Sequence, residues 1–454
     1  MKVIKFGGSS LATGAQLEKV SHIVQADAQR RVIVVSAPGK RHAGDSKVTD
    51  LLKQLADAVL SRQDPLPLID VILARYTEIQ THFALTEDVV AKLRAHLIGL
   101  TQQTYSSAAY LRDAFMAQGE HMNAQLVAAV LKAQGLPVRF VSPQTLGIVL
   151  AGAPGHVQVD PQTYRNLAQF SLGPAEYIVV PGFYAFDAKQ RIVTFPRGGS
   201  DITGSILARG LHADLYENFT DVSWVYAADP HLVKAPRAIN TVTYREMREL
   251  AYAGFSVFND EALIPVIEAN ICVNIKNTND PDAPGTLISP TKNVKHHHHI
   301  TGVAAKKDFT ALYLHRYLIN AQVGFTLKLL QILSNYGVPY EHMPSGIDDL
   351  TVIIDKHELT AAKQQAITEE VQAQIQPDTL EWLDDLAIVM VVGEGLYASI
   401  DLVPRIMVAM ADAGVTPAVI NQGASRISLM LAVPNAQAQA AVQAIYGLSS
   451  KHQA

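Results

Sequence analysis

The chain opens with Met1-Lys2-Val3-Ile4-Lys5-Phe6-Gly7-Gly8-Ser9-Ser10, and this stretch decides the fold. Its apolar residues predict a buried strand, and Gly7-Gly8 predicts a loop without side chains that would block a close approach. Backbone N–H groups in such a turn and the hydroxyls of Ser9-Ser10 can point at phosphate oxygens, while Lys5 adds a positive charge. An ordinary strand–turn–helix start with a chance lysine is the alternative on these ten residues.

Composition narrows the class of protein. A chain of 454 residues with 48% hydrophobic and 17% charged residues predicts a globular protein of about two to four domains. The net charge of −5 argues against nucleic acid as a partner. The single cysteine, Cys272, excludes an internal disulfide framework and fits a reducing compartment. With no signal-peptide pattern at the start and no apolar run long enough for a bilayer, we expect a cytoplasmic protein without a membrane partner.

A βαβ unit follows from the opening stretch. Helical spacing of apolar residues continues to Asp27, and the run 31–35 predicts a strand buried on both faces, followed by the polar turn Ser36-Ala-Pro-Gly39. Ligands of open α/β sheets bind beside such strand ends. The charged, glycine-containing stretch 40–46 predicts a mobile loop. Thr49 is predicted to cap the next helix, with a substrate contact as the alternative.

A second Gly-Gly loop, Pro196-Arg197-Gly198-Gly199-Ser200-Asp201, joins a predicted strand to a predicted helix. Arg197 suits a two-pronged contact with a carboxylate, and Asp201 suits an ammonium group. A positive and a negative side chain four residues apart predict a site for a zwitterionic amino acid. A surface ion pair is the alternative. Glu120 opens another predicted helix, where a carboxylate is favourable to the helix dipole whatever its function.

Six motifs in matching order resemble those of aspartate kinases, which belong to the amino acid kinase fold. They are Lys5-Phe-Gly-Gly-Ser-Ser10, Val34-Val-Ser-Ala37, Val48-Thr-Asp50, Gly119-Glu120, Arg197-Gly-Gly-Ser-Asp201, and Thr220-Asp221 through Tyr226-Ala-Ala-Asp-Pro230. The resemblance covers the whole chain. It implies an α/β catalytic domain over residues 1–292, built on an open, mostly parallel sheet between helices.

The resemblance also implies residue roles. Lys5 and Asp201 are the expected catalytic residues, with Lys5 stabilising charge on the transferring phosphoryl group. The expected aspartate contacts are Thr49, Glu120, Arg197, Ser200 and Asp201. Arg197 would bind the α-carboxylate, and Glu120 and Asp201 would lie near the α-amino group. The expected ATP contacts are Lys5, Gly7, Gly8, Ser9, Ser36, Thr220, Asp221, Tyr226, His231, Ser256 and Val257. His231 and Ser256 stand where many relatives have basic residues.

The implied reaction is ATP-dependent phosphorylation of the side-chain carboxylate of L-aspartate to 4-phospho-L-aspartate, the entry step to lysine, threonine and methionine biosynthesis. Phosphoryl transfer requires positioning and charge neutralisation, with Mg²⁺ bound mainly through the ATP phosphates and no protein metal site. A kinase for another amino acid, such as glutamate, is one alternative, because one methylene changes binding by only about 1–3 kcal/mol. A non-catalytic amino-acid sensor is the other.

The last third carries an internal repeat of 77 residues, in which Asp308, Gly337 and Gly346 recur as Asp385, Gly414 and Gly423. Strands predicted at 309–314 and 387–392 and helices at 324–335 and 400–413 make each copy a ferredoxin-like βαββαβ unit. In this context the repeat resembles two ACT domains, 303–380 and 381–454, in a separate or an intertwined arrangement, after a linker at 293–302. The run His296–His299 is expected to be solvated rather than a metal site.

The ACT resemblance implies feedback by an amino-acid effector, lysine or threonine, and a homodimer or homotetramer formed through these domains. The expected effector contacts are Gly324, Phe325, Thr326, Tyr340 and Glu341. Gly393-Glu394-Gly395-Leu-Tyr-Ala398 imitates a dinucleotide fingerprint, but the repeat already accounts for it, and no P-loop pattern occurs.

Overall fold

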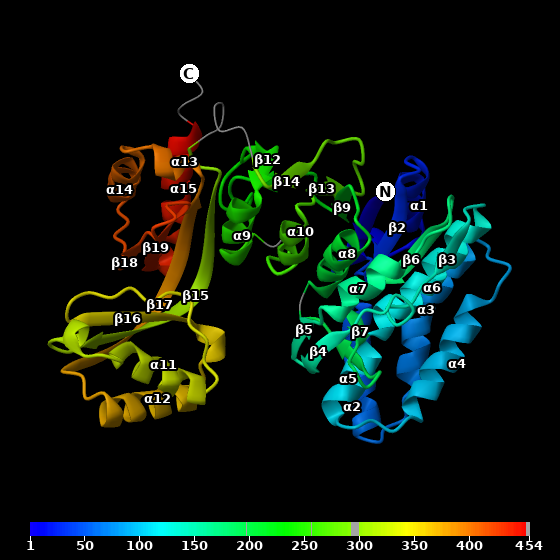
Figure 1. Cartoon of the computed structure of the whole chain (residues 1–454), viewed down its shortest axis with the longest axis horizontal. Helices are drawn as coiled ribbons and strands as arrows, with labels where there is room; N and C mark the ends of the chain where they lie inside the picture. Colours follow the sequence, from blue (N-terminus) through cyan, green and yellow to red (C-terminus); the bar gives the residue numbers. More distant parts are fainter. Residues whose placement is uncertain (197, 256, 292–298, 451–454) are drawn as a thin grey trace. The chain divides into compact units, whose positions relative to one another are not determined.

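The computed structural model describes residues 1–196, 198–255, 257–291 and 299–450, which form two compact units (Figure 1). The first unit comprises Met1–Val225, Ala238–Ala251 and 257–291. The second comprises Tyr226–Arg237, Tyr252–Phe255 and 299–450. The units are therefore not consecutive in sequence, because two short segments that lie between parts of the first unit along the chain belong to the second unit.

The elements of the first unit, in chain order, are β1 (Lys2–Phe6), η1 (Gly8–Leu11), α1 (Gly14–Gln25), β2 (Arg30–Val35), α2 (Val48–Leu60), α3 (Leu66–His82), α4 (Val89–Thr101), α5 (Ala108–Met116), α6 (Gln118–Ala133), β3 (Val138–Phe140), β4 (Leu150–Ala153), β5 (His156–Val159), α7 (Gln162–Gln169), β6 (Tyr177–Pro181), β7 (Tyr184–Phe186), β8 (Ile192–Thr194), α8 (Gly199–Gly210), β9 (Leu215–Thr220), β11 (Ala238–Ile239), β12 (Thr241–Thr243), α10 (Leu263–Ala269), β13 (Val273–Asn277) and β14 (Thr286–Ser289). Two further elements, β10 (Val225–Tyr226) and α9 (Tyr244–Tyr252), each end on the first residue of a segment of the second unit.

Within the described residues, the large sheet of this unit has eight strands in the order β12-β14-β13-β9-β1-β2-β6-β3. The opening strand β1 is central and pairs in parallel with both β2 and β9. Apart from the antiparallel pair β13–β14, the pairings in this sheet are parallel. This confirms the open, mostly parallel sheet. The carboxyl ends of β1, β2 and β9 therefore lie next to one another at one edge.

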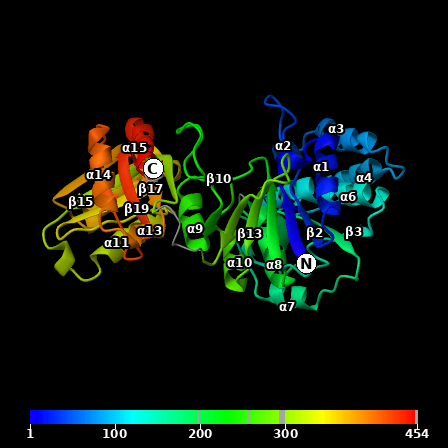
Figure 2. The same ribbon diagram turned by 90° about the horizontal axis from the view of Figure 1, so that it is seen from above.

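Helices cover both faces of this sheet. Figure 2 shows α1, α3, α4 and α6 on one side of the strands and α7, α8 and α10 on the other. Ile4 and Phe6 pack into the core beneath α1–α6. Because side chains alternate along a strand, Lys5 points to the opposite side, toward α8. The strand thus places the charged side chain of Lys5 between the apolar residues Ile4 and Phe6.

The elements of the second unit are β15 (Gly302–His315), η3 (Ile319–Ala321), α11 (Phe325–Asn335), β16 (Asp349–Asp355), η4 (Lys356–Glu358), α12 (Ala361–Gln374), β17 (Thr379–Val392), α13 (Gly395–Ala398), α14 (Leu402–Asp412), β18 (Val419–Asn421), β19 (Ser428–Pro434), η5 (Asn435–Gln437) and α15 (Ala438–Ser450). A five-stranded sheet in the order β16-β15-β17-β19-β18 runs through it, and all its pairings are antiparallel.

The two repeats share this single sheet. In Figure 1, α11 and α12 lie at one end of the long strands β15 and β17, and α14 and α15 lie at the other. One core joins the second half of β15 to α11 and α12, and the other joins Val303 of β15 to α14 and α15. The strands bend at Asp308 and Asp385, whose φ angles are 69° and 64°. Each long strand therefore serves both cores, so the two halves interleave.

The segment 226–237 is integrated into the second unit. Ala228 and Val233 belong to the same apolar core as α14 and α15. The N–H of Val303 donates to the carbonyl of Ala227 over 2.8 Å, and the Gln443 side-chain amide donates to the carbonyl of Leu232 over 2.7 Å. Across the described parts of both units, none of the helices has the length and apolar character that crossing a membrane requires.

Candidate active site

Lys5 and Asp201 form the charged centre of the first unit. The Nζ of Lys5 lies 2.6 Å from Oδ1 of Asp201, and only 10% and 13% of the two side chains are exposed. Asp201 stands in the first turn of α8, so the second Gly-Gly loop brings it to the end of β1. The side-chain amide of Asn218 donates to the same Oδ1 over 2.8 Å, which fixes the carboxylate from β9. This network holds a positive charge at a constant position.

The Gly7-Gly8 loop passes directly beside this centre. The N–H of Gly7 donates to the carbonyl of Phe219 over 3.0 Å, and a Cβ added at Gly7 would lie 3.8 Å from the Lys5 ammonium. A Cβ added at Gly8 would lie 2.8 Å from the carbonyl oxygen of Ala37, so a larger residue could not occupy this turn unchanged. The N–H of Gly7 is thus occupied, and the backbone N–H groups that follow it, beside the Lys5 ammonium, are the donors suited to phosphate oxygens.

The two serines of the loop differ. Ser9 is exposed, whereas the buried Ser10 forms a 2.7 Å hydrogen bond between its hydroxyl and that of Thr278. The hydroxyl of Ser10, which the sequence offered as a second phosphate donor, is thus engaged by Thr278, and the contact of Ser9 with phosphate stays a prediction. Ser36, at the end of β2, is half-buried, and its carbonyl accepts a 2.6 Å hydrogen bond from the side chain of Asn123.

Glu120 lies in the first turn of α6 and is 5% exposed. Burial raises the pKa of its carboxyl group to about 8, against the opposing influence of the Ala37 N–H, the positive charge of Lys5 and the hydroxyl of Ser200. Its Oε2 has no hydrogen-bond partner among the described residues. A buried carboxyl oxygen left in this way is suited to receive the ammonium group of a ligand.

Ser200 and Thr49 occupy two further helix starts. Ser200 is 8% exposed, and a Cβ added at Gly182 would lie 2.6 Å from its Cβ, so the glycine lets α8 approach the end of β6. Thr49 is half-buried in the first turn of α2. The prediction that Thr49 caps this helix is wrong, because the capping position is Lys47, whose side chain makes no cap hydrogen bond.

The residues expected to contact ATP divide between the units. Lys5, the glycines and Ser36 lie in the first unit together with Thr220, whose hydroxyl donates to Asp221 over 3.1 Å. Val257 is half-buried in the same unit. Tyr226 and His231 belong to the second unit. Arg197, Ser256 and the histidines 296–298 lie outside the described residues.

The expected effector residues all lie in the second unit. Gly324 has a φ of 79° and precedes α11, and Tyr340 is 46% exposed. The side chain of Phe325 is 2% exposed and packs in the core of α11 and α12, so only its backbone is suited to a ligand. Burial, together with Asp355 and Glu358, raises the pKa of Glu341.

The sequence did not predict two residues that help to form the site, Asn218 and Asn123. Asn218 pairs with Lys5 in the register of β9 and β1. Its signal was present, because it lies two residues before Thr220 and therefore on the same side of its strand. Asn123 stands one helical turn after Glu120, where its carboxamide reaches the carbonyl of Ser36. A single sequence does not reveal the strand neighbour or the helix partner that gives either residue its place.

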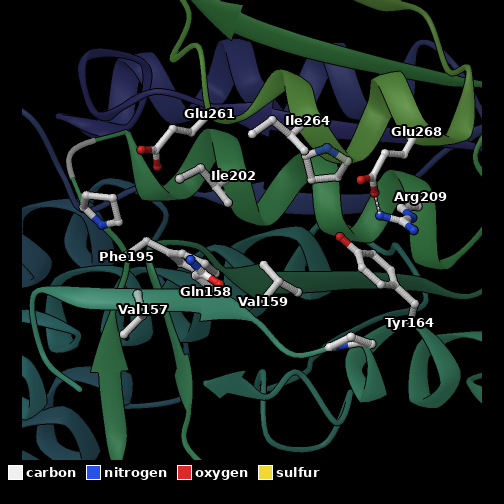
Figure 3. Close-up of a pocket in the computed structure, with 13 residues that line it drawn as sticks. Val157, Gln158, Val159, Tyr164, Phe195, Ile202, Arg209, Glu261, Ile264 and Glu268 are labelled. Atoms are coloured by element: carbon white, nitrogen blue, oxygen red, sulfur yellow. Dashed lines mark hydrogen bonds and ion pairs between the residues drawn. The ribbon is translucent and has the colours of Figure 1, made fainter. Parts of the chain in front are cut away.

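A separate pocket of about 650 Å³ lies among β5, α7, α8 and α10 (Figure 3). Phe195, Ile202 and Ile264 form much of its apolar lining, and Arg209 pairs with Glu268 at one end. The Arg209 guanidinium carbon lies 3.8 Å from the centre of the Tyr164 ring. Neither Lys5 nor Asp201 lines this pocket. It is distinct from the charged centre.

Among the described residues, no group of three or more His, Cys, Asp and Glu side chains is arranged to hold a metal ion. A Cβ added at Gly8 would meet the carbonyl oxygen of Ala37 and the backbone of Gly39, so this glycine allows the two loops to approach each other closely.

Comparisons with known proteins agree with this arrangement. Residues 1–277 match the amino acid kinase family, and residues 389–447 match an ACT domain. The chain is 44% identical to aspartokinase 3 of Bacillus subtilis over 446 residues, which cover 98% of both chains. The structure of aspartate kinase from Clostridium acetobutylicum, an allosteric enzyme, superposes with a TM-score of 0.87 at 36% identity, covering 99% of this chain and 100% of that one.

Escherichia coli aspartokinase III shares the fold at 24% identity. Its complex with aspartate and ADP superposes with a TM-score of 0.81, covering 98% of this chain and 99% of that one. Its complex with lysine and aspartate superposes with a TM-score of 0.77, covering 99% of each chain. The predicted amino acid kinase fold and ACT-type C-terminal region are confirmed, and the chain belongs to the aspartokinase family.

Proposed function

We propose that this protein transfers the γ-phosphoryl group of ATP to the side-chain carboxylate of L-aspartate. The observation that carries the proposal is the Lys5 ammonium held by Asp201 beside the Gly7-Gly8 loop. The product is 4-phospho-L-aspartate, which enters the biosynthesis of lysine, threonine and methionine. That role and the single cysteine both favour a cytoplasmic enzyme.

The reaction uses the residues as positioning groups. A side-chain carboxylate oxygen of aspartate attacks the γ-phosphorus, the bond to the bridging oxygen breaks, and ADP leaves with the electron pair. Aspartate has a side-chain pKa of about 3.9, so the attacking group is ionised at pH 7 and no general base is required. Lys5 neutralises charge that develops on the phosphoryl oxygens, and Asp201 keeps its ammonium directed at them.

ATP would lie with its phosphates on the Gly7-Gly8 loop and the exposed Ser9. Mg²⁺ would arrive with the nucleotide rather than on a site of protein side chains, and it would supply positive charge against the phosphates. Ser36, Thr220, Asp221 and Val257 are proposed nucleotide contacts in the first unit. Tyr226 and His231, which belong to the second unit, stay predictions from the sequence. Ser256 stays a prediction from the sequence.

L-Aspartate would place its ammonium against the unpartnered Oε2 of Glu120. The hydroxyls of Ser200 and Thr49 are proposed contacts at the starts of α8 and α2. Arg197 is proposed to bind the α-carboxylate, because a guanidinium offers two parallel donors to a carboxylate. Asp201 is already paired with Lys5 and would contribute to the ammonium site through the second of its oxygens.

The second unit is proposed to bind an amino-acid effector, lysine first and threonine as the alternative. Lysine is favoured by Glu341, which faces Asp355 and Glu358 and so forms an acidic surrounding for a long cationic side chain. The second repeat offers Ala418 at the position 77 residues after Glu341, so the acidic contact is specific to the first repeat. A homodimer or homotetramer through the ACT-type units is the proposed assembly.

The reaction is tested by incubating the protein with ATP, Mg²⁺ and L-aspartate and trapping the acyl phosphate with hydroxylamine. We expect a hydroxamate that requires all three components. L-Glutamate in place of L-aspartate tests the alternative substrate. A protein that forms no hydroxamate with any amino acid, yet binds lysine, would be an amino-acid sensor instead.

A further inference from the structure

Arg75 of α3 clamps the loop between β2 and α2. Its guanidinium donates to the carbonyl of Gly39 over 2.6 Å and to the carbonyl of Ser46 over 3.1 Å. It also pairs with Asp45, whose carboxylate oxygen lies 2.8 Å away. One side chain thus holds both ends of the stretch 39–46. The mobility of the stretch 40–46 stays a prediction, although Arg75 contacts two of its residues, Asp45 and Ser46.

The Gly39 end of the clamp touches the phosphate loop. The N–H of Gly39 donates to the carbonyl of Gly8 over 2.8 Å. A Cβ added at Gly39 would lie 2.6 Å from the carbonyl carbon of Gly8 and 2.8 Å from the N of Ser9. The backbone of the two loops is therefore in direct contact. Because C=O and N–H point in opposite directions across a trans peptide, fixing the Gly8 carbonyl on Gly39 turns the Ser9 N–H to the other side.

The contacts of Arg75 are buried, and burial of its guanidinium removes a charged group from water. The Arg75 side chain is 4% exposed, and its Nε lacks a hydrogen-bond partner within the described part of the chain. Burial and the nearby Arg41 lower the pKa of Arg75. Arg41 pairs with Asp45 from the solvent side, at 3.0 Å, and with Glu78. A guanidinium alone offers donors in a fixed fork that can reach two carbonyls and a carboxylate together.

We propose that Arg75 is a positioning residue for phosphoryl transfer, which sets the conformation of the Gly7-Gly8 phosphate loop through Gly39. The proposal rests on the proposed function, because it assigns that loop to the phosphates of ATP. Arg75 itself does not touch substrate. It acts through two hydrogen bonds in series, from its guanidinium to Gly39 and from Gly39 to Gly8.

The test compares Arg75→Ala and Arg75→Lys with Arg41→Ala. Arg41 is the matched control, because it pairs with the same Asp45 but its side chain contacts neither Gly39 nor Ser46 in the described contacts. Steady-state rates are measured against ATP and against aspartate, ATP binding is measured by calorimetry without aspartate, and melting temperature reports the fold. Guanidinium chloride at low millimolar concentration is then added to Arg75→Ala, with methylammonium chloride as the control ion.

For Arg75→Ala we expect kcat/KM for ATP to fall about 100-fold, since displacement of a positioning group by about 1 Å costs that order of rate. Guanidinium ion restores part of the loss by filling the vacated space, and methylammonium does not. Arg75→Lys keeps the positive charge that pairs with Asp45 but cannot reach both carbonyls. Its kcat/KM for ATP should therefore lie between that of the wild type and that of Arg75→Ala. Arg41→Ala stays within about twofold of the wild type.

Folded Arg75 variants that use ATP as the wild type does would overturn the proposal. So would a guanidinium addition that leaves folded Arg75→Ala unchanged. If Arg75→Ala does not fold, Arg75→Lys alone decides, by the same ATP measurements. If the wild type forms no acyl phosphate, the proposed function is wrong. If the wild type is active and the Arg75 variants use ATP equally well, only the role proposed for Arg75 is wrong.

Discussion

The ammonium of Lys5 lies 2.6 Å from Oδ1 of Asp201, which joins the first glycine loop of the chain to the second. Lys5 lies near the end of β1 and Asp201 lies in the first turn of α8, so the pair also fixes the helix start against the strand. The carboxylate orients the lysine and reduces the cost of burying its charge. The ion pair is therefore the structural basis for placing phosphoryl transfer at this point.

Replacement of Lys5 tests its role in charge neutralisation. We expect Lys5→Ala to lower kcat by about two to four orders of magnitude, because a preorganised charge acts mainly on the transition state. The control is Lys2→Ala on the same strand, since Lys2 pairs with Asp27 at 2.8 Å and belongs to no site. Near-normal turnover of a folded Lys5→Ala would make this lysine a bystander.

Glu120 predicts a pH dependence for aspartate. Burial raises the pKa of its carboxyl group to about 8, so the group is mostly protonated below that pH and mostly ionised above it. The ionised form binds an ammonium group better, and KM for aspartate should therefore fall as pH rises from 6 to 8, by up to about tenfold per unit, and level off above 8.

The measurement is kcat/KM for aspartate from pH 6 to 9, with Glu120→Gln as the comparison. The amide cannot ionise, so the variant should bind aspartate weakly and lose the pH dependence. A wild-type profile that stays flat over this range, or a dependence that survives in Glu120→Gln, would remove Glu120 from the ammonium site.

Arg197→Ala is expected to weaken the use of aspartate far more than that of ATP. Loss of a charge-assisted, two-pronged contact should cost about 2–5 kcal/mol. Arg209→Ala is the matched control, because Arg209 lies in the last turn of α8 and pairs with Glu268. Steady-state kinetics in which Arg197→Ala keeps the wild-type dependence on aspartate would exclude this contact.

Feedback inhibition tests the second unit. Activity at fixed substrate concentrations should fall as lysine rises, with threonine as the alternative effector, and a coupling of about 1–3 kcal/mol would shift affinity several-fold to a hundredfold. Glu341→Ala should reduce the response to lysine, because it removes the half-buried carboxylate beside Asp355.

Glu381→Ala is a suitable control on the exposed first part of β17. Equal inhibition of wild type and Glu341→Ala would leave regulation in place but remove Glu341 from it. If neither lysine nor threonine inhibits the wild type, alone or together, the regulatory proposal fails.

The sequence was enough to predict the central sheet, because β1 and β2 are apolar runs that end in glycine or polar turns. It was also enough to name Lys5, Glu120 and Asp201 through their motifs. It could not show that Lys5 and Asp201 touch, since this depends on which strand lies beside β1. For the same reason Asn218, which shares the carboxylate of Asp201, was missed.

The contact of Arg75 with the loop 40–46 could not be predicted for a related reason. The composition of this loop is typical of a solvated connector, but Arg75, on a helix that follows it in the chain, donates to the carbonyl of Ser46 and pairs with Asp45. In the second unit the predicted strand 309–314 is the second half of the longer strand Gly302–His315. At Asp308 the alternation of apolar residues is interrupted, which suggests the end of a strand. The backbone instead bends there, with a positive φ, and the strand continues.

Mass spectrometry of the hydroxylamine-trapped product shows which carboxyl group of which amino acid receives the phosphoryl group. We expect aspartate that carries the hydroxamate on its side-chain carbon, formed with L-aspartate and ATP, retained in Lys2→Ala and nearly absent in Lys5→Ala. A hydroxamate on the α-carboxyl group, a preference for glutamate over aspartate, or full product formation by Lys5→Ala would contradict this expectation.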